Sequence, residues 1–114
     1  MAKRHQVTVP PVVKLGAHEY QVALVHGLST RGRAVGASSA PLGKIQIDPD
    51  RTSTQRLQTL LHELVHQGHF VFGAGSREPP AAQCDSFAEA VTQLLTGVME
   101  LDFDWSNLPL EESS

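Results

Sequence analysis

Residues 57–72 read Leu-Gln-Thr-Leu-Leu-His-Glu-Leu-Val-His-Gln-Gly-His-Phe-Val-Phe, and the spacing of their apolar residues predicts an amphipathic helix. With 3.6 residues per turn, the leucines fall on one side of this helix and the histidines on the other. His62 and His66 are four residues apart, so their imidazoles lie one turn apart on one face and can bind one metal ion. Glu63 lies about 100° round the helix from His62, beside such an ion, which is the position of a general base.

A second helix is expected to supply the third protein ligand that a catalytic zinc site needs. The metzincin pattern, with a glycine three and a histidine six residues after the second histidine, is excluded because His69 and Phe72 occupy those positions. The helix expected over Ala82 to Met99 carries Asp85 and Glu89 on one side. Its opposite, apolar side should consist of Cys84, Phe87, Val91, Leu94, Leu95 and Val98.

Glu89 is the preferred third ligand, because its side chain is longer than that of Asp85. Asp85 is the alternative ligand, or it orients a ligating histidine, or it complements the dipole at the start of the helix. The plain alternative for Glu89 is a solvated surface carboxylate. For the histidines, the plain alternative is the polar side of an ordinary amphipathic helix.

His62-Glu63-Leu64-Val65-His66, followed by Glu89-Ala90-Val91-Thr92-Gln93, resembles the gluzincin arrangement of zinc metallopeptidases. The short chain is similar to minigluzincins and to small metallopeptidase-like proteins of bacteriophages and mobile elements. The resemblance implies that His62, His66 and Glu89 hold Zn²⁺ and that Glu63 is catalytic. Gln93 departs from the pattern, because many gluzincins have an aspartate there that contacts a ligating histidine.

The resemblance also implies how a peptide substrate is held. In metallopeptidases of this kind an edge strand pairs with the extended substrate, and the strand expected at Lys44 to Asp48 is the candidate. Two residues are candidates for the group that would stabilise the oxyanion. His69, near the histidine face, and Tyr20 are both considered, although each is more simply a surface histidine and a packed tyrosine.

Composition bounds the remaining possibilities. The 114 residues make one domain, 1–114, and 40% apolar with 18% charged residues is typical of a folded chain. A net charge of −3 gives no support to nucleic-acid binding, and no apolar run is long enough to span a membrane. The single cysteine, Cys84, is expected to be a buried small residue in a reducing compartment, so we expect a cytoplasmic protein. The oligomeric state is not indicated.

The expected fold is α+β: a small, mostly antiparallel sheet packed against two helices that carry the HExxH…E metal site. Strands are expected in four segments: Val7 to Leu15, broken by two prolines; Glu19 to Val25, pairing with it as a hairpin; a short strand near 33–36; and Lys44 to Asp48, followed by a turn. Ser53 or Thr54 should cap the first helix, which ends near Phe72. Phe103 and Trp105 should dock the chain before a frayed tail, about 107–114.

Three functions are consistent with these observations. The first is a zinc metallopeptidase that hydrolyses peptide bonds of a cytosolic protein. The alternative is a non-catalytic zinc-binding interaction or regulatory protein of a phage or mobile element. The last is a metal-free interaction domain in which the histidine pattern is accidental.

Overall fold

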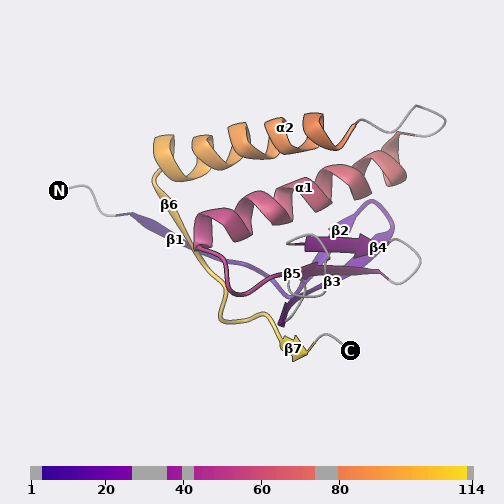
Figure 1. The fold of residues 1–114 in the computed structure, drawn as a ribbon, viewed down its shortest axis with the longest axis horizontal. Coiled ribbons are helices and arrows are strands. Elements are labelled where there is room, and N and C mark those ends of the chain that lie inside the picture. Colours follow the sequence, from indigo (N-terminus) through magenta and orange to yellow (C-terminus); the bar gives the residue numbers. More distant parts are fainter. Residues whose placement is uncertain (1–3, 27–35, 40–42, 74–79, 113–114) are drawn as a thin grey trace.

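The computed structural model describes residues 4–26, 36–39, 43–73 and 80–112. Within these ranges the chain forms seven strands and two α-helices, and the second helix continues into one π-helical turn (Figure 1). In chain order the elements are β1 (His5–Thr8), β2 (Val12–Leu15), β3 (His18–His26), β4 (Gly36–Ser39), β5 (Lys44–Ile47), α1 (Ser53–Phe72), α2 (Ala81–Gln93), η1 (Leu94–Val98), β6 (Leu101–Asp104) and β7 (Leu110–Glu112). The α+β class is therefore confirmed.

The main sheet has the strand order β2-β3-β5-β4, and β7 also pairs with β3. The predicted hairpin is confirmed, because β2 and β3 are antiparallel across a turn at Gly16, whose φ of 61° suits glycine. The expectation of a mostly antiparallel sheet is wrong. β5 and β7 both run parallel to β3, and β1 pairs in parallel with β6 in a separate ribbon. The sheet is mixed because its central strand takes parallel partners from distant parts of the chain.

The predicted substrate strand, Lys44 to Asp48, is not at the edge of the sheet. β5 lies between β3 and β4, so both of its sides are paired. Among the described strands, β4 and β2 end the strand order of this sheet. β4 is antiparallel to β5 and lies under α1. The part of the expected strand that falls at residues 33–35 lies outside the described residues.

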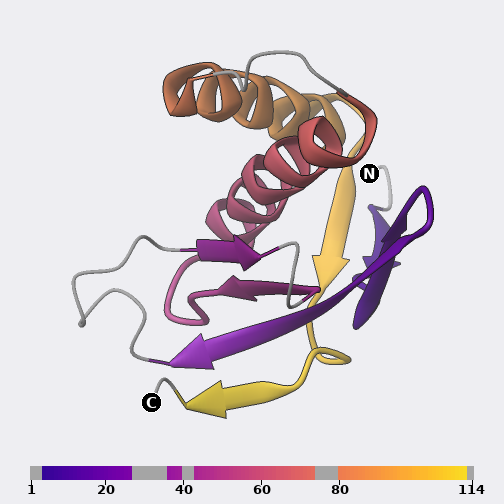
Figure 2. The same cartoon turned by 90° about the vertical axis from the view of Figure 1, so that its right-hand side faces the viewer.

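The helices form two layers on one side of the sheet. α1 packs directly on β2, β4 and β5, whereas α2 packs on α1 and lies farther from the sheet (Figures 1 and 2). The expectation that both helices cover the sheet is thus correct only for α1. Because α2 is held mainly by α1, residues on facing sides of the two helices lie close to one another.

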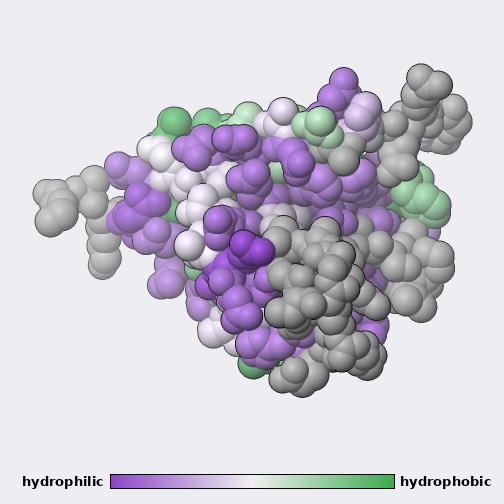
Figure 3. Space-filling model, viewed as in Figure 1, coloured by the Kyte–Doolittle hydropathy of each residue, from purple (hydrophilic) through white to green (hydrophobic). Residues whose placement is uncertain are grey.

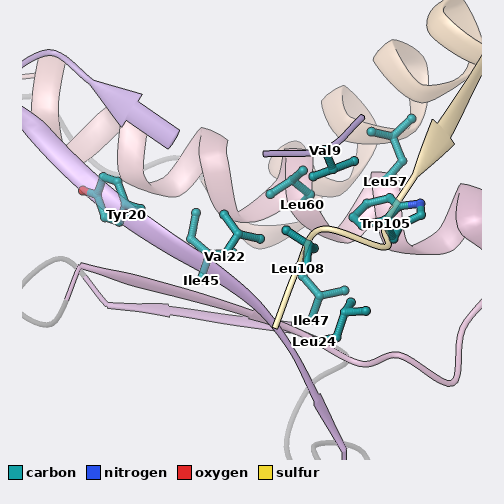
Figure 4. Close-up of a cluster of buried hydrophobic side chains, with 10 residues drawn as sticks. All are labelled: Val9, Tyr20, Val22, Leu24, Ile45, Ile47, Leu57, Leu60, Trp105 and Leu108. Carbon is teal, nitrogen blue, oxygen red and sulfur yellow. The ribbon is translucent and has the colours of Figure 1, made fainter. Parts of the chain in front are cut away.

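The core fills the space between α1, the sheet and the segment after β6 (Figure 4). Alternate residues of β3 and β5 point into it, as their period of two requires. Its buried members are Val9, Tyr20, Val22, Leu24, Ile45, Ile47, Leu57, Leu60, Trp105 and Leu108. Leu61 and Leu64 pack against this cluster, so the predicted apolar side of α1 is confirmed.

Thr52 caps the start of α1, one residue before Ser53 and two before Thr54, the positions that we expected. Its hydroxyl accepts a hydrogen bond from the backbone N–H of Gln55 at 3.2 Å, and the Gln55 side chain accepts one from the backbone N–H of Thr52 at 3.1 Å. This reciprocal capping box satisfies two donors that a helix start leaves unpaired. Ser53, the expected cap, instead accepts a hydrogen bond from Trp105 Nε1 at 2.9 Å. The helix ends at Phe72, as predicted.

The buried side of α2 differs from the predicted apolar side. Its fully buried residues are the small side chains of Cys84, Ala88 and Thr92. Phe87 is 58% exposed, and Leu94 and Val98 are also exposed. Figure 3 shows apolar surface along the upper edge of the molecule, where Figure 1 places α2. Small residues face α1 because they let two helices approach closely, and hydrophobicity alone did not indicate this. The prediction that Cys84 is buried is confirmed.

The expected frayed tail is wrong for residues 107 to 112. Trp105 is buried, as expected, but Leu108 is buried too, and β7 continues the sheet by pairing with β3. Leu24 N–H donates to the carbonyl of Pro109 at 2.9 Å, which fixes the approach to β7. Within the described ranges, no helix is long and apolar enough to cross a bilayer.

Candidate metal centre

His62 and His66 meet on the side of α1 that faces away from the core. Their Nε2 atoms are 3.1 Å apart, and their rings are edge-on, with centroids separated by 4.7 Å. His62 is 19% exposed, so its ring is reachable but largely shielded. The spacing of four residues has therefore brought two nitrogen atoms to one point, as predicted.

The separation of these nitrogens fits two ligands of one ion. Zinc binds histidine nitrogen at about 2.0–2.1 Å in tetrahedral geometry, which places two such nitrogens about 3.3 Å apart. The observed 3.1 Å is within a few tenths of an ångström of that value. Two neutral imidazoles without a metal also approach this closely when one donates a hydrogen bond to the other. The distance thus permits metal binding and does not require it.

Glu63 lies next to the histidine pair without belonging to it. Its Oε2 is 4.0 Å from His62 Nε2, and its side chain is only 12% exposed. A second ligand of the same tetrahedral ion would lie about 3.3 Å from His62 Nε2. A separation of about 4 Å is reached only when two ligands lie on opposite sides of an ion. The position instead suits a carboxylate that contacts a water held at the histidines.

Asp85 reaches the other nitrogen of His62 from the first half of α2. Its Oδ1 is 2.6 Å from His62 Nδ1, and its side chain is 65% exposed. The oxygen is not in line with the ring N–H, so this is a close polar contact rather than an aligned hydrogen bond. A carboxylate beside Nδ1 favours the tautomer with the proton on that nitrogen, which leaves the Nε2 lone pair directed toward His66.

This contact bears on the three roles considered for Asp85. A carboxylate on the outer nitrogen of a histidine orients that histidine and does not ligate the ion itself. Of the alternatives, the structure favours the orienting role. Gln93, where many gluzincins have the orienting aspartate, is exposed on α2, and Asp85 approaches His62 from two turns earlier.

Glu89 is exposed on α2, one turn beyond Asp85. Among the residues that the structure describes, no group of three His, Cys, Asp or Glu side chains lies close enough to hold a metal ion. The structure therefore brings together two of the three predicted ligands, His62 and His66. The role of Glu89 as a ligand stays a prediction.

Tyr20 is not placed to stabilise an oxyanion. It is fully buried, and its hydroxyl donates to Gln67 Oε1 at 3.0 Å. His69 is partly buried on α1, and its carbonyl accepts the backbone N–H of Gly73. No described contact directs the His69 ring toward His62 and His66.

Gln67 is the residue near the site that the sequence did not reveal. It follows His66 and is 7% exposed, and its bond to Tyr20 ties α1 to β3 within the core. The alternation of β3 indicated that Tyr20 faces the interior, but nothing in the sequence indicated its partner. Comparison of the chain with protein-family models, curated proteins and solved structures finds no match.

Proposed function

We propose that the protein is a zinc-dependent metallopeptidase. The observation that carries the proposal is the pair of Nε2 atoms at 3.1 Å, with a carboxylate against the outer nitrogen of one ring and another carboxylate 4.0 Å from its inner nitrogen. Each of these groups has a part in metal-assisted hydrolysis. The gluzincin resemblance of the sequence supports the same assignment.

His62 and His66 would hold the zinc ion, and Glu89 is the proposed third ligand. Bound zinc would supply a Lewis acid that lowers the pKa of water and polarises a carbonyl. Glu63 would accept the proton of the attacking water and deliver it to the leaving amine. Its shielded carboxylate suits this task, because Oε2 lies 4.0 Å from His62 Nε2. That distance is close enough to contact a water held at the histidines and too long for a direct hydrogen bond to His62.

The substrate is proposed to be an extended peptide of a cytosolic protein. β4 supports this proposal, since it is an edge strand of the described sheet and lies under α1. An edge strand offers unpaired backbone groups to which an extended peptide adds as a further strand. β4 thus replaces the Lys44 to Asp48 strand as the proposed substrate strand.

Metal content tests the site. Purified wild-type protein loaded with zinc is compared with His66→Ala and Glu89→Ala by mass spectrometry, and Glu63→Gln is the control that keeps the ligands. We expect one zinc per chain in the wild type and the control, and loss of zinc in the other two variants. Retention in Glu89→Ala would remove this residue from the ligand set, and absence of zinc from the wild type would overturn the proposal.

Hydrolysis tests the activity separately. We expect zinc-loaded wild type to cleave members of a pool of unstructured peptides, and Glu63→Gln to bind zinc equally but cleave none of them. The second candidate function is a non-catalytic zinc-binding regulatory protein, which would use the same pair of histidines. That function predicts zinc binding in both proteins and cleavage in neither.

A further inference from the structure

Phe70 lies on the same side of α1 as the two histidines. Residues 62, 66 and 70 follow one another at intervals of four, so each lies about 40° further round the helix than the last. Phe70 is 60% exposed, although its ring is large and apolar. The exposed ring of Phe70 therefore belongs to a residue that lies about 6 Å along the helix axis from His66.

His18 holds one edge of the Phe70 ring. The two ring centroids are 5.9 Å apart, and the planes meet at 76°, which is the edge-on arrangement that aromatic rings prefer. His18 begins β3, and Tyr20, two residues later on the same strand face, bonds to Gln67 of α1. The second half of α1 is thus fixed on β3, and the position of Phe70 is fixed with it.

We infer that Phe70 and His18 form a subsite for a large apolar, preferably aromatic, side chain of a peptide. This inference rests on the proposed function and adds the substrate class. An extended peptide advances about 3.3 Å per residue, so 6 Å corresponds to a residue one or two positions from the bond at the histidines. A peptide side chain placed there covers apolar surface that water now contacts, and an aromatic one adds ring-to-ring contact.

The probes are three hydroxamates, compounds whose head group binds zinc. Acetohydroxamate has no side chain, and two peptide hydroxamates differ only by phenylalanine or glycine next to the head group. Their affinities are measured by calorimetry on zinc-loaded wild type, Phe70→Ala and His18→Ala. Phe72→Ala is the matched control, because Phe72 is 65% exposed but lies about 200° round the helix from Phe70.

We expect the wild type to bind the phenylalanine compound about tenfold more tightly than the glycine compound. The ratio should fall below about threefold in Phe70→Ala, fall less in His18→Ala and stay unchanged in Phe72→Ala. Acetohydroxamate should bind all four proteins equally. Equal affinity for the two peptide compounds in the wild type, or an unchanged ratio in Phe70→Ala, would overturn the subsite alone. No binding of acetohydroxamate would overturn the metal centre, and the subsite with it.

Discussion

Replacing Asp85 by asparagine should weaken zinc binding without abolishing it. The carboxylate contacts His62 Nδ1 at 2.6 Å, and partners of this kind contribute about 10-fold to 100-fold to metal affinity. Asp85 is 65% exposed, so water and salt screen its charge, and the lower end of that range applies. We therefore expect the Kd for zinc to rise about tenfold, which is about 1.4 kcal/mol.

Competition with a chromophoric chelator measures this change in Kd. Asp50→Asn is the matched control, because Asp50 is 73% exposed and contacts a histidine elsewhere, with His26 Nδ1 at 3.9 Å from its Oδ2. The effect of Asp85→Asn should shrink as salt is raised, whereas Asp50→Asn should bind zinc like the wild type. Equal Kd values for the wild type and Asp85→Asn, or the same loss in the control, would refute the orienting role. Complete loss of zinc would make Asp85 a direct ligand.

Three further predictions concern the fold. Tyr20→Phe should lower the free energy of unfolding by about 1 kcal/mol in urea titrations, because it removes the hydrogen bond that the Tyr20 hydroxyl donates to the buried Gln67 Oε1. A double-mutant cycle with Gln67→Met that shows no coupling would contradict this. Gly43→Ala should cost about 2 kcal/mol or more, because φ is 59° and the new Cβ would lie 2.8 Å from the Glu19 carbonyl oxygen; an unchanged melting temperature would refute it. The backbone N–H of Ser106 donates to Asp104 and lowers the pKa of that carboxyl below its ordinary 3.8. The contribution of this hydrogen bond to the free energy of unfolding is therefore fully present above pH 3.8 and is lost as the pH falls through the lower pKa of the folded state. Asp104→Asn should flatten that part of the stability profile, and an unaltered acid limb measured by circular dichroism would count against the assignment.

The sequence predicted best those features that depend on local spacing. His62 meets His66 because of the helical period, and α1 ends at Phe72 because Gly73 follows it. The capping box of Thr52 and Gln55 was also readable, although we placed the cap one or two residues later. Asp85 was correctly placed near the histidine face, but whether it or Glu89 would reach the site depends on the packing of two helices.

Features that depend on distant segments were not predictable in the same way. Strand alternation shows which residues of β3 face inward, but it does not choose between parallel and antiparallel partners. β7 was assigned to a frayed tail because its few residues have no strong pattern, and its pairing with β3 stabilises it. Phe87 was expected in the core because it is apolar, yet Ala88 and Cys84 occupy the contact with α1, since they allow a closer approach.

The order of the elements along the chain has a consequence for synthesis. β1 is joined to β6 by parallel pairing and by Arg4, whose Nε lies 2.7 Å from Asp102 Oδ1, 98 residues away. β3 likewise pairs with β7, which lies near the other end of the chain, whereas α1 and α2 are neighbours in the sequence. On a ribosome, the helical pair that carries His62 and Asp85 emerges before the sheet can acquire its last strands. Because long-range pairing of this kind is slow, completion of the sheet should set the folding rate.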